Sequence, residues 1–318
     1  MMKIVILDAY TANPGDLDWG GLEELGELSV YDRTPENEIL SRIGDAEIVL
    51  TNKTPLARGT MAKCPNLRYI GVMATGYNVV DTAAAKELGI AVTNVPSYGT
   101  RSVSQTAIAM LLEICHHYQA HSDAVFAGEW CASPDFSFWK FPLIELAGKT
   151  MGVVGFGRIG QATAKIAEAL GMNILACDAY KNPALVTETC RYAELDEVLC
   201  ESDVIALHCP LLPSTRGMIN RENLAKMKKS AILINASRGE LVVEQDLADA
   251  LNGGVIYHAA VDVISEEPMR PGNPLLKAKN LFISPHIAGA CKEARIKRVS
   301  ISAENVRQFL GGTPVNLV

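Results

Sequence analysis

The sequence lacks the features that mark a membrane, a secreted or a nucleic-acid-binding protein. No apolar stretch approaches the roughly 20 residues that a membrane-spanning helix requires. Its eight cysteines are scattered without a C-x-x-C pair, so neither a zinc site nor a disulfide framework is indicated. Acidic residues outnumber basic ones by 36 to 29, so no basic surface is expected for a nucleic acid or an anionic membrane. We therefore expect a globular protein of the reducing cytoplasm, with the cysteines as small buried hydrophobic residues.

Aromatic residues are also scarce, at 6%, but they gather in one segment, 126–141. The Gly, Asp, Ser and Pro residues of this segment argue against a regular buried element. Ordinary core remains the alternative, but the composition favours a contact between subunits. The aromatic residues of the segment are Phe126, Trp130, Phe136, Phe138, Trp139 and Phe141.

The 318 residues favour about two domains, and both halves of the chain alternate apolar runs with helix-like stretches. This alternation predicts α/β domains, each with a parallel sheet covered by helices on both faces. The expected strands of the first third are 3–8, 28–31, 47–51, 68–73 and 91–94. A long helix is expected from Ser102 to about Ala127. His117 and His121 lie one turn apart on it with Cys115 nearby, but no third ligand is evident, so no metal is expected.

A second alternating series begins at Thr150 and has enough strands for a complete doubly wound nucleotide-binding sheet. The last helix, about 292–310, has no strand left to join in that sheet. We infer that it returns to cover the first domain, which would make that domain discontinuous. The strands expected in this series are 151–155, 173–177, 204–209, 231–235, 257–263 and 280–284.

The segment from Gly155 to Gly160 matches the pattern G-x-G-x-x-G at the point where a strand ends and a helix begins. In this context Gly155 permits the tight turn, Gly157 lets a pyrophosphate approach the backbone, and Gly160 lets the helix pack closely on the strand. Asp178 ends the next strand, where an acid accepts hydrogen bonds from ribose hydroxyls and repels a 2′-phosphate. Lys181 is a weak argument to the contrary. The pattern predicts NAD rather than NADP as the cofactor.

Three polar residues, Arg238, Glu267 and His286, each closely follow an apolar strand of the second series. Ligands bind at the carboxyl ends of the strands in such sheets. Alone, each residue could be solvated surface or packing, but the set suits the reduction of a 2-keto acid. Arg238 can hold the substrate carboxylate and polarise the carbonyl. His286 can donate the proton, and Glu267 can orient His286 and favour its charged form.

Three segments that contain these residues resemble the signature segments of the D-isomer-specific 2-hydroxyacid dehydrogenases. They are 235–239 (NASRG), 262–268 (DVISEEP) and 284–289 (SPHIAG). With Gly155–Gly160 the resemblance runs in order over essentially the whole chain. It implies Arg238, Glu267 and His286 as the catalytic residues. One departure is Ile264, where the family usually has Phe, and we expect only a local change of packing.

The resemblance also implies a domain plan and a set of cofactor contacts. A Rossmann NAD-binding domain, 100–290, would be inserted in a flavodoxin-like substrate domain of 1–99 and 291–318. Hinges are expected at 98–101 and 290–293. Such enzymes are typically dimers joined through their cofactor domains. Beyond Gly155, Gly157 and Gly160, the expected cofactor-binding residues are Arg158, Ile159, Asp178, Cys209, Pro210, Thr215, Ala236, Ser237, Arg238, Asp262, His286 and Gly289.

Within the family, segments 53–55, 74–81 and 94–100 most resemble the glycerate dehydrogenase (hydroxypyruvate reductase) branch. Small residues at Ala74, Thr75 and Gly76 would let backbone N–H groups approach a carboxylate. Lys53 is the main additional cation, and no arginine cluster suits a phosphate. These residues favour a short, polar, unphosphorylated acid, and the resemblance implies hydroxypyruvate as the substrate, with glyoxylate weaker. Trp139 is expected to reach the site of a neighbouring subunit. The alternatives are a phosphoglycerate or D-lactate dehydrogenase, or an NAD-sensing binding protein like the family's corepressors.

Overall fold

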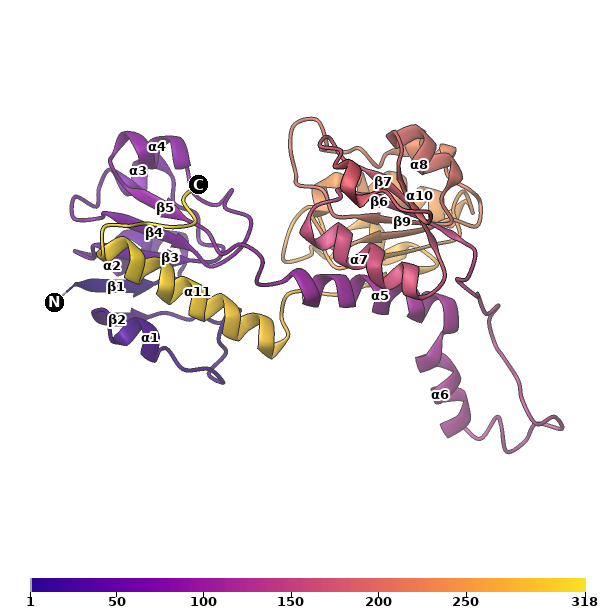
Figure 1. Ribbon diagram of the computed structural model, residues 1–318. Helices are drawn as coiled ribbons and strands as arrows, with labels where there is room; N and C mark the ends of the chain where they lie inside the picture. Colours follow the sequence, from indigo (N-terminus) through magenta and orange to yellow (C-terminus); the bar gives the residue numbers. More distant parts are fainter. Residues whose placement is uncertain (1) are drawn as a thin grey trace. The chain divides into compact units, whose positions relative to one another are not determined.

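The computed structural model describes residues Met2–Val318, which divide into two compact units (Figure 1). The first unit contains the chain up to Gly99 together with Gly289–Val318, and the second contains Thr100–Ala288. Each unit is an α/β domain built on a parallel sheet, which confirms the predicted fold class. No helix in the described part of the chain is long and apolar enough to span a membrane.

The first unit has a five-stranded parallel sheet with the order β2-β1-β3-β4-β5. The order changes direction at β1, as in flavodoxin-like sheets. Its strands are β1 (Lys3–Ile6), β2 (Glu27–Val30), β3 (Ile48–Thr51), β4 (Tyr69–Val72) and β5 (Ala91–Thr93). Its shorter helices are α1 (Gly20–Glu23), α2 (Ile39–Ile43), α3 (Arg58–Met61) and α4 (Thr82–Glu87), with a 3-10 turn η1 (Glu36–Glu38).

The last helix, α11 (Lys292–Leu310), belongs to this first unit and lies against its sheet (Figure 1). Val299, Ala303 and Val306 pack in one cluster with apolar side chains of β1, β3 and β4. The ring of Phe309 lies 4.8 Å from that of Tyr69. The buried amide of Asn305 donates to the carbonyl of Asn94 at 2.8 Å, just beyond β5. The helix therefore covers one face of the sheet that the first third of the chain forms.

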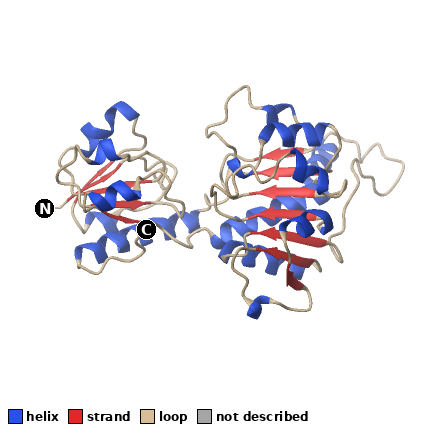
Figure 2. Ribbon diagram, turned by 90° about the horizontal axis from the view of Figure 1, so that it is seen from above, coloured by secondary structure: helices blue, strands red, loops and turns tan. Residues whose placement is uncertain are grey.

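The second unit has a seven-stranded parallel sheet with the order β12-β11-β10-β9-β6-β7-β8, and helices lie on both of its faces (Figure 2). Six of the seven strands follow the expected runs. The seventh, β8, is a three-residue edge strand of sequence CRY, too short and too polar to stand out in the sequence. The strands are β6 (Thr150–Val154), β7 (Asn173–Cys177), β8 (Cys190–Tyr192), β9 (Val204–Leu207), β10 (Ile232–Asn235), β11 (His258–Val261) and β12 (Leu281–Ile283).

Two apolar clusters cover the two faces of this sheet. One face packs against helices α5 (Thr100–His116) and α7 (Arg158–Ala169). The other face packs against α8, α9 and α10. Those three helices are α8 (Leu195–Glu201), α9 (Arg221–Lys226) and α10 (Glu244–Asn252), and the 3-10 turns of the unit are η2 (Pro183–Leu185), η3 (Gly239–Leu241) and η4 (Pro274–Lys277).

The long helix expected from Ser102 to about Ala127 is interrupted, and that prediction was wrong. α5 ends at His116, and a second helix, α6 (Tyr118–Phe126), begins after His117. His117 has a φ of +48°, in the left-handed region that ends a helix. Its ring is buried and packs on the ring of Phe141, 4.6 Å away. A contact with a residue far along the chain therefore stabilises the interruption of the helix, at a position where the sequence has no proline or glycine.

His258 makes the stability of the second unit depend on pH. Its side chain is only 5% exposed, and burial lowers its pKa to about 4 from the ordinary 6.5. The unfolded chain binds a proton there between pH 6.5 and 4, whereas the folded chain does not. Stability is therefore full above about pH 6.5 and falls as the pH approaches 4. Each pKa unit corresponds to about 1.4 kcal/mol.

We predict that His258→Gln reduces this dependence, and that His208, whose pKa burial also lowers to about 4, keeps its own contribution. The loss of unfolding free energy between pH 7 and pH 4.5 should be smaller in the variant than in the parent by about 2–3 kcal/mol. Urea unfolding checks this, followed by the fluorescence of Trp130 and Trp139 in a Trp19→Phe background so that only the second unit reports. Equal losses in parent and variant would show that His258 is not the titrating group.

Candidate active site

Apart from Trp139, the predicted site residues of the second unit follow the strands of its sheet. The strands are parallel, so their carboxyl ends meet at the same edge, where open α/β sheets bind ligands. The glycine-rich turn follows β6, Asp178 follows β7, and Cys209 follows β9. Arg238, Glu267 and His286 follow the three adjacent strands β10, β11 and β12.

The glycine-rich turn has the geometry that a dinucleotide requires. Gly155 has a φ of +93°, and a Cβ there would lie 2.3 Å from the backbone nitrogen of Cys209. A Cβ at Gly160 would lie 2.1 Å from the carbonyl oxygen of Gly155. Beside Gly157, which precedes α7, the space within 4 Å is open among the described residues. A phosphate can therefore approach the N-terminus of a twelve-residue helix closely, and the residues fit NAD.

Asp178 holds this turn in place. Its carboxylate accepts hydrogen bonds from the backbone N–H of Phe156 at 2.6 Å and of Tyr180 at 2.9 Å. Lys181, the residue that argued for NADP, pairs with Glu194 at 2.5 Å. The strand end therefore presents a fixed carboxylate, and the nearest lysine in sequence has an acidic partner.

The loops after β9 and β10 are joined by the hydroxyl group of one predicted cofactor residue, Ser237. The Ser237 hydroxyl donates to the carbonyl of Cys209 at 2.6 Å. The Thr215 hydroxyl donates to the carbonyl of Pro210 at 2.8 Å and closes the loop after β9. Ala236, the residue that follows β10, is buried. These residues therefore form one continuous rim beside the glycine-rich turn.

Arg238 is positioned by a residue that the sequence analysis did not single out. The fully buried Asn235 donates from its side-chain amide to the carbonyl of Arg238 at 2.9 Å and accepts from the N–H of Ser237 at 3.1 Å. A Cβ at Gly239 would lie 1.8 Å from the carbonyl carbon of Ile264. Only glycine therefore fits there, and it brings the Arg238 segment against the turn that carries Glu267.

Glu267 and His286 form the central pair of the site. His286 Nδ1 lies 2.6 Å from Oε2 of Glu267, and both side chains are about one-third exposed, at 38% and 32%. The other Glu267 oxygen accepts from the N–H of Ile264 at 3.3 Å, so the carboxylate is held from two sides. Because Nδ1 faces the carboxylate, Nε2 is the nitrogen that can exchange a proton with a ligand. Ile264, which stands where the resembled family usually has Phe, makes this bond through its backbone N–H, so the different side chain does not affect it.

The predicted substrate residues Lys53, Ala74, Thr75 and Gly76 lie in the first unit, at the carboxyl ends of β3 and β4. Asp8, which follows β1 and was not predicted, accepts hydrogen bonds from the N–H groups of the loop that contains Lys53. The distances are 2.7 Å to Asn52, 2.5 Å to Lys53 and 2.9 Å to Thr54. The only sequence signal for Asp8 was an acid directly after a buried strand.

Two further predicted substrate residues, Thr75 and Trp139, differ in their surroundings. Hydrogen bonds to the loop after β5 hold Thr75, whereas the side chain of Trp139 is exposed. The Thr75 hydroxyl donates to the carbonyl of Val95 at 3.0 Å, and its own carbonyl accepts from the Asn94 amide at 2.8 Å. Trp139 lies in the second unit and is 68% exposed. Gly289 belongs to the first unit, one residue beyond the end of the second.

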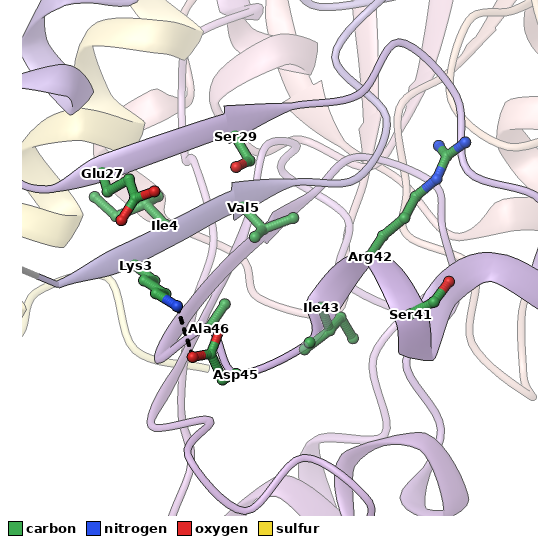
Figure 3. Close-up of a pocket in the computed structure, with 11 residues that line it drawn as sticks. Lys3, Ile4, Val5, Glu27, Ser29, Ser41, Arg42, Ile43, Asp45 and Ala46 are labelled. Atoms are coloured by element: carbon green, nitrogen blue, oxygen red, sulfur yellow. Dashed lines mark hydrogen bonds and ion pairs between the residues drawn. The ribbon is translucent and has the colours of Figure 1, made fainter.

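A pocket lies at the opposite, amino-terminal edge of the first sheet (Figure 3). It is lined by the beginning of β1 and β2 and by the loop after α2. Lys3 on its wall pairs with Asp45 at 2.6 Å. None of the predicted site residues lines it, so it is not a candidate for the cofactor or the substrate.

Comparison with known proteins shows the family of the chain. The model of the family "D-isomer specific 2-hydroxyacid dehydrogenase, NAD binding domain" matches residues 108–288. The chain is 61% identical to a hydroxypyruvate reductase of Blautia hydrogenotrophica, over 100% of this chain and 99% of that one. It is 42% identical to a glycerate dehydrogenase of Methylorubrum extorquens, over 90% and 89% of the two chains.

Solved structures show the same fold over the whole chain. The apo structure of D-lactate dehydrogenase from Escherichia coli superposes with a TM-score of 0.83 at 28% identity and covers 100% of both chains. D-lactate dehydrogenase from Aquifex aeolicus, in complex with NAD and lactic acid, gives a TM-score of 0.84 at 29% identity, over 98% of this chain and 96% of that one. The chain therefore belongs to the D-isomer-specific 2-hydroxyacid dehydrogenases and is an enzyme that uses NAD to interconvert a 2-keto acid and its D-2-hydroxy acid.

Proposed function

We propose that the enzyme reduces hydroxypyruvate to D-glycerate, with glyoxylate as a poorer substrate. The observation that carries this proposal is the 61% identity, over the full length of both chains, to a hydroxypyruvate reductase. The identity to a glycerate dehydrogenase supports the same substrate pair. Hydroxypyruvate carries one carboxylate and no phosphate, which fits a site with Arg238 and Lys53 as its proposed cations.

Arg238 is the proposed residue for binding and polarising the substrate. Its planar guanidinium can hold the carboxylate and lie beside the adjacent carbonyl oxygen. As the carbonyl is reduced, that oxygen gains negative charge, which a fixed cation stabilises more in the transition state than in the ground state. Bound NADH supplies the hydride. The bonds of Asn235 and the contact of Gly239 with Ile264 hold the segment of Arg238 still during this change.

His286 is the proposed proton donor to the developing alkoxide, and in the reverse direction it takes the proton from the hydroxyl group. Its Nδ1 bond to Glu267 fixes the ring and directs Nε2 away from the carboxylate. The bond to Glu267 holds Nδ1 while Nε2 gives up its proton. Donation from Nε2 balances the reaction, since one hydride and one proton convert the keto group to the secondary alcohol.

The remaining predicted residues keep their proposed roles. Gly155, Gly157, Arg158, Ile159 and Gly160 would bind the pyrophosphate, and Asp178 the ribose. Beside them, the rim of Cys209, Pro210, Thr215, Ala236 and Ser237 would line the cofactor, with Asp262 and Gly289 as further contacts. Ala74, Thr75 and Gly76 would offer backbone N–H groups to the substrate carboxylate, near Lys53.

We also propose a homodimer of cytoplasmic protein, formed through the aromatic segment 126–141 of the NAD-binding unit. Phe126 and Phe136 are each 90% exposed, which is unusual for phenylalanine and favours burial against a second copy. Trp139 of this segment would reach the substrate site of the neighbouring subunit. All eight cysteines are free thiols, which suits a reducing compartment.

The substrate assignment predicts an order of kcat/KM with NADH. Hydroxypyruvate should come first, glyoxylate second, and pyruvate and 3-phosphohydroxypyruvate well below. NADH oxidation with the four acids measures this, and His286→Gln serves as the control for contaminating activity. Loss of the proton donor should lower turnover by roughly 10²–10⁴-fold while NADH still binds. A preference for the phosphorylated acid or for pyruvate would move the enzyme to another branch of the family.

The bonds of Asp178 predict a double effect for Asp178→Ala. The variant should lose affinity for NADH, because both the ribose contact and the bond that holds the glycine-rich turn disappear. It should also discriminate less against NADPH, because the repulsion of the 2′-phosphate is gone. Binding of both cofactors, followed by fluorescence, checks this. An unchanged ratio of the two affinities would remove Asp178 as the discriminating residue.

The dimer predicts that charge in the aromatic segment separates the subunits. Phe126→Asp combined with Phe136→Asp should halve the mass measured by sedimentation at micromolar concentration. Leu276→Asp is the matched control, because Leu276 is also an exposed apolar residue of this unit, at 55%, but lies outside the segment. Separation by the control, or no separation by the double variant, would place the interface elsewhere.

A further inference from the structure

The turn that carries His286 has an unfavourable backbone conformation. His286 has a φ of +55°, in the left-handed region where a residue with a Cβ is disfavoured by about 1–2 kcal/mol. A residue stays in this region only when its surroundings fix it. The direction of the imidazole depends on that conformation, so the groups that hold the turn also determine where Nε2 points.

One residue, Asp262, makes most of the contacts that hold this turn. It follows β11, next to β12 in the sheet, and is 1% exposed. Its Oδ1 accepts from the Ser284 hydroxyl at 2.5 Å and from the N–H of Ile287 at 2.9 Å. Its Oδ2 accepts from the N–H of Ala288 at 2.7 Å, and its backbone carbonyl accepts from the N–H of His286 at 2.8 Å.

The far end of the turn is fixed as well. The carbonyl of Ala288, the last residue of the second unit, accepts from the Ser102 hydroxyl of α5 at 2.5 Å. Residues 284–288 are therefore tied to β11 along their length and to α5 at their end. Asp262 is the only residue that contacts both sides of His286 in this set of bonds.

We propose that Asp262 is the positioning residue for His286, rather than chiefly a contact to the cofactor. This rests on the proposed role of His286 as the proton donor and extends it. A carboxylate suits the task because its two oxygens accept three donors, and bonds to a charged acceptor are roughly twice as strong as neutral ones. An asparagine would have one acceptor oxygen and would turn an NH2 group toward a backbone N–H.

The test is Asp262→Asn, measured on whichever 2-keto acid the parent enzyme reduces. A misplaced acid should lower kcat by a factor on the order of 10². The affinity for NADH and the KM for the keto acid should change little, because Arg238 and the glycine-rich turn are untouched. The solvent deuterium isotope effect on kcat should rise, because proton transfer becomes the slow step.

Ser284 provides a milder second variant in case Asp262→Asn does not fold. Ser284→Ala removes one of the three bonds to the carboxylate and should lower kcat in the same manner but less, and Ser284→Thr should restore it. Asp203→Asn is the matched control, because Asp203 accepts from the N–H of Thr150 at 2.9 Å at the opposite end of the same sheet. The Asp203→Asn variant should have the same kcat and the same solvent isotope effect as the parent enzyme.

The outcomes separate this proposal from the function on which it rests. A parent enzyme inactive on every 2-keto acid would overturn the proposed function. An active parent whose Asp262→Asn variant loses NADH affinity, but keeps its kcat at saturating NADH, would overturn the positioning role and leave a cofactor contact. The positioning role would also be overturned if Asp262→Asn and Ser284→Ala both showed the same solvent deuterium isotope effect on kcat as the parent enzyme.

Discussion

Three aspartates, each shortly after the end of a strand, hold the loops that contain predicted site residues. Asp8 follows β1 and binds N–H groups of the loop after β3. Asp178 follows β7 and binds the turn after β6, and Asp262 follows β11 and binds the loop after β12. In each case the loop belongs to the strand that pairs directly with the strand of the aspartate. One arrangement therefore recurs in both units.

The recurrence has a physical reason. Where a parallel strand ends, its backbone N–H groups lose their partners in the sheet, and an unpaired buried N–H is costly. A short carboxylate on the next strand can accept two or three of them without regular structure. The loop is then free to leave the sheet and still has one conformation, as a binding site requires. At Asp178 such a carboxylate would also repel the additional phosphate of NADP, as proposed above.

The parts of the site predicted from the sequence are those with a local signal. The glycine-rich turn lies between a strand and a helix, and Arg238, Glu267 and His286 each come shortly after an apolar run. Asn235 lies inside a buried strand and gave no such signal, and Asp8 gave only its place just after a buried strand, because the role of each depends on bonds to a loop. The break at His117 was missed for the same reason, since the contact that stabilises it comes from Phe141, 24 positions later.

Register explains how residues so far apart in sequence make one site. Asn235 pairs with Val261, and Val261 pairs with Ile283, so the last residues of β10, β11 and β12 lie side by side in one line across the sheet. Arg238 and His286 each come three residues after this line, whereas Glu267 comes six residues after it. Its bond to the N–H of Ile264 folds the extra length back toward the sheet. The carboxylate thereby returns to the level of the imidazole, and the contact of Gly239 with Ile264 sets the same turn against the Arg238 segment. A shift of any one of these strands would therefore separate the residue that follows it from the other two.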